Sequence, residues 1–70
     1  MNVIIIRGIE LPITVKGVTL PDADGDFNVY INTKYSDEQR RQVADHEIKH
    51  ITLDHFYNDD PVIINELEAG

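Results

Sequence analysis

The chain has 70 residues, a formal net charge of −7 and no cysteine. A single domain of this size has a marginal core and cannot add disulfides, so a metal ion or a second copy in a homo-oligomer would be a usual source of extra stability. The longest apolar run, Val3 to Ile6, is too short for a membrane span or a signal peptide, and there is no basic patch for nucleic acid. We therefore expect a cytoplasmic protein with no membrane and no nucleic-acid partner.

The first half of the sequence predicts about three antiparallel strands. The run "VIII" (3–6) is β-branched and continuous, as in a buried strand. The stretches "IELPITV" and "VTL" follow, with Gly8 and Gly17 marking turns. "PDADGD" (21–26) is a strong turn signal, and "FNVYI" (27–31) alternates like a half-buried strand. If strand 27–31 lies at a free edge of the sheet, it can bind an extended peptide by strand addition.

The second half predicts two helices. Ser36 and Gln39 have the spacing of a capping box, which places a helix from Asp37 to the mid-50s. Asn58 to Asp60 then break the pattern. Asp60 can cap a second, short helix that begins at Pro61 and runs to the end of the chain.

The first helix contains the sequence "HEIKH" (46–50), which matches H-E-x-x-H. With about 100° per residue, His46 and His50 lie one turn apart on the same side, as two ligands of one metal ion must. Glu47 falls between them and the core face, where a base acting on water belongs. That core face is formed by Val43, Ala44, Ile48 and Ile51. The alternative interpretation is an exposed helix with two surface histidines and a solvated glutamate.

The remaining histidines and carboxylates are the candidates for a third ligand. His55 would point away from His46 on a continuous helix and suits the helix C-terminus better. On the predicted second helix, Glu66 falls within the apolar face and Glu68 on the opposite side. A carboxylate directed into an apolar face is costly unless it is paired or binds metal, so Glu66 is the better candidate. A helix end that frays into solvent remains the alternative.

Three stretches resemble the ImmA/IrrE-type metallopeptidases, in particular the very short members from bacterial and phage-like mobile elements. They are "FNVYIN", "YSDEQRRQVADHEIKHI" and "NELEAG", which together cover most of residues 27–70. The resemblance implies a minimal zincin-like fold, with Zn²⁺ bound by His46, His50 and Glu66. Glu47 would then be the catalytic base.

Residues 1–70 are thus expected to form one α+β domain. About three antiparallel strands would pack on the active-site helix, with a short C-terminal helix closing the site. The expected function is a zinc-dependent peptidase, a hydrolase that acts on a protein or peptide such as a transcriptional repressor. The main alternative is a regulatory module with the zincin shape that binds a protein partner without cleaving it. A purely structural zinc domain is disfavoured, because such sites usually include cysteine.

Overall fold

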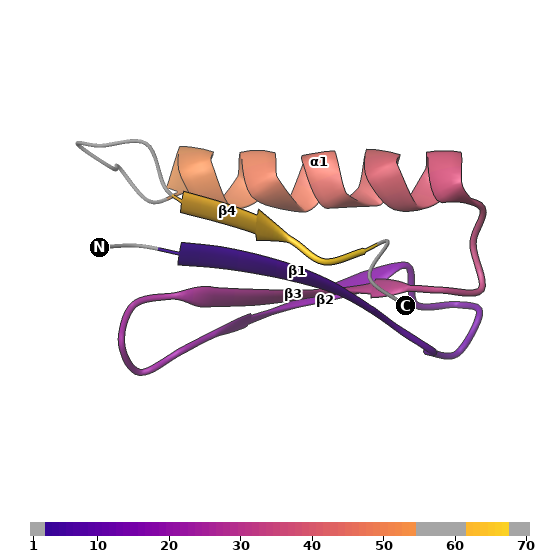
Figure 1. The fold of residues 1–70 in the computed structure, drawn as a ribbon, viewed down its shortest axis with the longest axis horizontal. Coiled ribbons are helices and arrows are strands. Elements are labelled where there is room, and N and C mark those ends of the chain that lie inside the picture. Colours follow the sequence, from indigo (N-terminus) through magenta and orange to yellow (C-terminus); the bar gives the residue numbers. More distant parts are fainter. Residues whose placement is uncertain (1–2, 55–61, 68–70) are drawn as a thin grey trace.

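The computed structural model describes residues 3–54 and 62–67. They form an α+β fold in which one helix lies along one face of a four-stranded sheet (Figure 1). The elements are β1 (Val3–Ile9), β2 (Gly17–Pro21), β3 (Phe27–Asn32), α1 (Asp37–Asp54) and β4 (Val62–Asn65). The strands are arranged in the order β2-β3-β1-β4, and α1 packs over β3 and β2. Within the described ranges, no helix is long and apolar enough to cross a membrane.

The prediction for α1 is confirmed in its bounds, its cap and its core face. The backbone N–H of Gln39 donates to Oγ of Ser36 at 3.2 Å, and the N–H of Ser36 donates to Oε1 of Gln39 at 3.3 Å. This reciprocal pair satisfies donors that the first helical turn leaves open. The buried hydrophobic core consists of Ile4, Ile6, Phe27, Val29, Ile31, Ala44 and Ile51, with Val43 and Ile48 packed against it.

The predicted turn between β2 and β3 is also confirmed. The N–H of Gly25 donates to the carbonyl of Asp22 at 3.1 Å, and Gly25 has φ of 87°. Glycine adopts this backbone conformation without the steric cost that a Cβ brings. The two strands are therefore antiparallel, with registers from Gly17↔Ile31 to Pro21↔Phe27.

The prediction that all strands are antiparallel is wrong. β1 runs parallel to β3, with Ile4 opposite Phe27, and β1 is also parallel to β4. Residues 10–16 carry the chain past the end of β3, so that β2 and β1 lie on opposite sides of it. Strand 27–31 is consequently central and not at a free edge, while β2 and β4 are the edge strands. Local sequence patterns report which face of a strand is buried, but they do not report its neighbours.

The predicted C-terminal helix is likewise wrong over residues 62–65, which form β4. Val3 lies opposite Val62 and Ile6 opposite Asn65, and the N–H of Glu66 donates to the carbonyl of Ile6 at 2.7 Å. Residues 62–64 are all β-branched, which favours a strand. The backbone N–H and C=O groups on the outer edge of β1 pair with them. The predicted cap at Asp60 and start at Pro61 lie outside the described residues.

Candidate functional site

The two histidines of the motif converge on α1. Nε2 of His46 and Nε2 of His50 are 2.9 Å apart, and the rings meet edge to face with centroids 4.4 Å apart. Both residues are exposed. One turn of helix between them brings the two rings to the same side, as the sequence pattern requires. The same contact serves as an imidazole hydrogen bond when one Nε2 carries a proton, or as a pair of nitrogens for one metal ion when neither does.

Glu47 lies next to the histidine pair and is turned towards β2. Oγ1 of Thr19 donates a hydrogen bond to Oε2 of Glu47 at 2.8 Å. Thr19 reaches the helix because it points to the same face of the sheet as its neighbour Val29 on β3, which is buried beneath α1. The residue is partly buried, and the hydrogen bond from Thr19 fixes the orientation of its carboxylate. A carboxylate held in this way can act as a proton acceptor.

An open groove of about 650 Å³ runs between α1 and the start of β2. It is lined by Thr14, Val15, Lys16, Gly17, Gln42, Val43, His46 and Glu47. Gly17 allows the close approach of strand and helix, because a Cβ built there would lie 3.1 Å from Cγ1 of Val43 and 3.1 Å from the carbonyl of Tyr30. His46 and Glu47 thus face a space that can admit a ligand.

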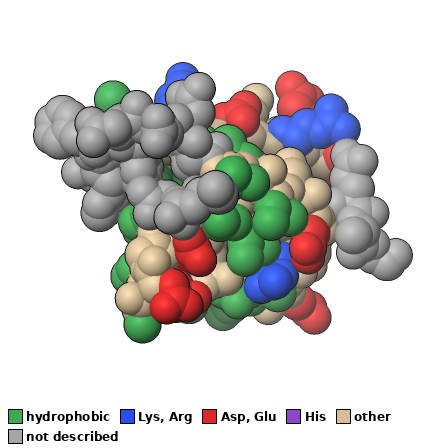
Figure 2. All heavy atoms as spheres, turned by 60° about the vertical axis from the view of Figure 1, so that its left-hand side comes forward, with side chains coloured by type: hydrophobic (Ala, Val, Ile, Leu, Met, Phe, Trp, Pro, Cys, Tyr) green, Lys and Arg blue, Asp and Glu red, His purple; other side chains and the backbone are tan. Residues whose placement is uncertain are grey.

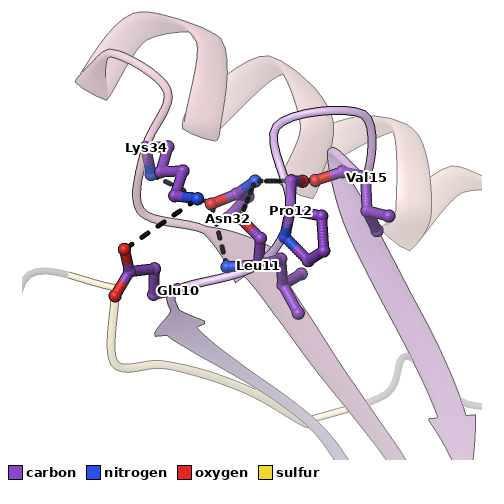
Figure 3. Close-up of polar contacts among 6 residues, drawn as sticks. All are labelled: Glu10, Leu11, Pro12, Val15, Asn32 and Lys34. Carbon is purple, nitrogen blue, oxygen red and sulfur yellow. Dashed lines mark hydrogen bonds and ion pairs between the residues drawn. The ribbon is translucent and has the colours of Figure 1, made fainter.

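Asn32 holds the loop that forms one wall of this groove (Figure 3). Its side chain is fully buried, and Nδ2 donates to the carbonyls of Leu11, Pro12 and Val15 at 3.1, 3.0 and 2.8 Å. Its Oδ1 accepts from the N–H groups of Leu11 and Lys34. Asn32 was not among the functional residues predicted from the sequence. The only signal was an asparagine at the end of a strand, a residue type that readily bonds to nearby backbone.

Glu66, the third predicted ligand, lies on the other side of the sheet. Ile6 points into the core beneath α1, so Arg7 points to the opposite face. Oε2 of Glu66 is 3.3 Å from Nε of Arg7, and both side chains are nearly half exposed. The structure therefore does not bring Glu66 to His46 and His50.

The assignment of Glu66 as a ligand depended on a helix, and a strand stands in its place. In the part of the chain that the structure describes, no three His, Asp or Glu side chains are grouped to hold a metal ion. His55 and Glu68 lie outside the described ranges.

Comparison with known proteins adds no assignment. No protein-family model matches the chain, and neither the curated proteins nor the solved structures contain a match. A small α+β fold alone supports many activities, so the function has to be argued from the side chains of the site.

Proposed function

We propose that this protein is a zinc-dependent peptidase of minimal size. The observation that carries the proposal is the convergence of Nε2 of His46 and Nε2 of His50 at 2.9 Å, on the helix that also carries Glu47, whose carboxylate Thr19 orients. Two imidazole nitrogens and a neighbouring carboxylate are the groups that zinc peptidases present from one helix. The groove lined by His46 and Glu47 gives a substrate access to these two residues.

The histidine pair fits a zinc ion. Two nitrogens at about 2.0–2.1 Å from one tetrahedral ion are roughly 3.3 Å apart, so the present separation of 2.9 Å needs a shift of a few tenths of an ångström. Both rings are exposed and free to make that shift. Glu66 does not fit the zinc ion in the same way, because it is paired with Arg7 on the face of the sheet opposite α1. As the third ligand, it would have to leave Arg7 and move to the helix side when the metal binds.

The chain's own residues have separate roles in this proposal. His46 and His50 would hold the metal, and zinc bound there would supply Lewis acidity. Glu47 accepts the proton of the attacking water and later passes a proton to the leaving amine. Thr19 keeps the Glu47 carboxylate turned towards the groove.

The outer edge of β2, which pairs with no further strand among the described residues, is the proposed place for the substrate backbone. The N–H of Asn32 donates to the carbonyl of Lys16 at 2.9 Å, which fixes the hydrogen-bonded pairs of this antiparallel ladder. Because the pairs alternate, the backbone groups of Gly17 and Thr19 face away from β3. An extended peptide paired with these groups would run beside His46 and Glu47. β2 would then bind the peptide by strand addition, as was expected of strand 27–31 from the sequence.

The deciding experiment compares wild type with Glu47→Gln, which keeps the shape of the side chain but accepts no proton. The probes are quenched fluorescent peptides and, separately, repressor-like proteins encoded by neighbouring genes and co-expressed with the chain. We expect wild type to cleave at least one of them, and Glu47→Gln to bind zinc equally well and cleave none. Equal cleavage by both proteins would remove Glu47 from the mechanism.

A binding module without catalysis is the second candidate, and the position of Glu66 on the far face favours it. In that case a partner protein binds wild type and Glu47→Gln equally tightly, and neither variant cleaves it. Zinc affinity of Glu66→Ala separates the two candidates further. A clear loss of affinity supports the peptidase with a mobile third ligand, whereas unchanged affinity supports the module.

A further inference from the structure

The face of the sheet opposite α1 carries mainly aliphatic side chains. By strand alternation and register, it includes Val3, Ile5, Val18, Leu20, Val62 and Ile64, which we call the open face. Two uncharged polar side chains of the central strand β3, Asn28 and Tyr30, lie between them. Leu20, Val62 and Ile64 are 50%, 43% and 41% exposed. Figure 2, in which the left-hand side of Figure 1 comes forward, shows hydrophobic side chains gathered on part of the molecular surface. The open face is thus an apolar surface that the described residues leave in contact with solvent.

The direction of the strands makes an uncovered open face unusual. β1 is parallel to both of its neighbours, β3 and β4. Strands paired in this way are normally covered on both faces of the sheet, and they then have continuous apolar sequences such as "VIII". Among the described elements, α1 covers one face of the sheet, and the sequence of β1 is suited to a second covering layer on the other.

The charge of the open face limits what that layer can be. Among the described strand residues and Glu66, the only charged side chains directed to this face are Arg7 and Glu66, which pair with each other. The face is therefore neutral, although the chain carries a net charge of −7. A basic partner would find its complementary charges elsewhere, on the acidic turn at 21–26 and on α1. A neutral apolar face suits an equally neutral apolar one.

We propose that the open face binds a second copy of this chain, sheet against sheet, with α1 on the outside of each copy. In a two-fold arrangement the same surface serves both partners, so Arg7 of each copy can meet Glu66 of the other. The four strands are 4 to 7 residues long and about 4.8 Å apart, so the open face measures about 20 Å by 20 Å, or roughly 400 Å² in projection. Protruding side chains add to this area, which still lies at the low end of interface sizes, below the roughly 800 Å² per partner of a standard interface, so we expect a weak dimer. The histidine groove lies on the opposite layer and stays accessible.

Sedimentation equilibrium of the full chain tests the proposal, in the presence of a chelator and from about 10 µM to about 1 mM protein. We expect a dimer with twice the monomer mass of 8.0 kDa. Leu20→Arg and Ile64→Arg place a charge in the interface without entering the core, so each should weaken dimerisation by about 100-fold or more. Leu53→Arg is the matched control, because Leu53 is 73% exposed on α1.

Circular dichroism of all the variants establishes that they are folded. A wild type that stays monomeric over this range overturns the proposal, and so do arginine variants that dimerise as wild type does. The proposed peptidase is tested separately, because zinc binding and cleavage are measured on α1 and do not enter this experiment.

Discussion

Oγ1 of Thr19 and Oε2 of Glu47 are 2.8 Å apart, which joins the edge strand β2 to the helix that carries both histidines. One hydrogen bond therefore orients the candidate base and fixes the strand edge along which a peptide would lie. Neither residue achieves this alone, because Glu47 without Thr19 is free to turn towards solvent.

Removing this hydrogen bond should cost a modest amount of stability. Thr19→Val keeps the shape of the side chain but leaves the partly buried carboxylate of Glu47 without its donor. We expect the free energy of unfolding to fall by about 1–2 kcal/mol, measured in urea. Thr14→Val, at the exposed rim of the same groove, should change it by less than about 0.5 kcal/mol. The double variant Thr19→Val with Glu47→Gln is the further check. If its loss in the free energy of unfolding equals the sum of the losses of the two single variants, the hydrogen bond does not contribute to stability.

Loss of either histidine should abolish tight zinc binding. His46→Ala or His50→Ala removes one of two converging nitrogens, and we expect affinity to fall by about 100-fold or more in calorimetric titration. Zinc should raise the melting temperature of wild type, because a ligand that binds only the folded state stabilises it. Lys49→Ala, on the same helix, is the control and should behave as wild type. Identical melting curves of wild type with chelator and with zinc would refute a metal site.

Asn32 should be the most sensitive polar residue in the described part of the chain. Asn32→Ala leaves the carbonyls of Leu11, Pro12 and Val15 without their buried donor, so we expect a loss of about 3 kcal/mol in the free energy of unfolding. Asn32→Asp should be no better, since a carboxylate oxygen would then face those carbonyls. Asn28→Ala, half-buried on the opposite side of the sheet from α1, should cost less than about 1 kcal/mol. A loss at Asn32 no larger than that at Asn28 would mean that the loop does not depend on it.

A methyl group at Gly17 should push α1 away from β2. The added Cβ would be 3.1 Å from Cγ1 of Val43 on α1 and 3.1 Å from the carbonyl oxygen of Tyr30, a backbone atom of β3 that moves only with its strand. We expect Gly17→Ala to lower the free energy of unfolding by about 1–3 kcal/mol, as other overpacked positions do. Lys16→Ala, at the exposed neighbouring position, should have little effect. A Gly17→Ala protein as stable as wild type would show that the helix and strand have room to separate.

The sequence by itself determined the elements whose signals are local. Ser36 and Gln39 fix the start of α1 because their hydrogen bonds span only three residues. The spacing of Val43, Ala44, Ile48 and Ile51 fixes its core face, and the same helical geometry brings His46 next to His50. Gly25 likewise fixes the turn before β3, because its backbone conformation is one that glycine favours.

Only the tertiary structure decided which strands pair and in which direction. Residues 62–65 form the strand β4 and not the predicted helix, because they pair with the edge of β1. No pattern within residues 62–65 indicates that this edge is present. The same pairing sends Glu66 to Arg7, away from the histidines, since alternate residues of a strand point to opposite faces. The burial of Asn32 also depends on a loop about 20 residues away in sequence. Contacts of this kind join distant segments, so they depend on the packing of the whole chain and are absent from any local stretch of it.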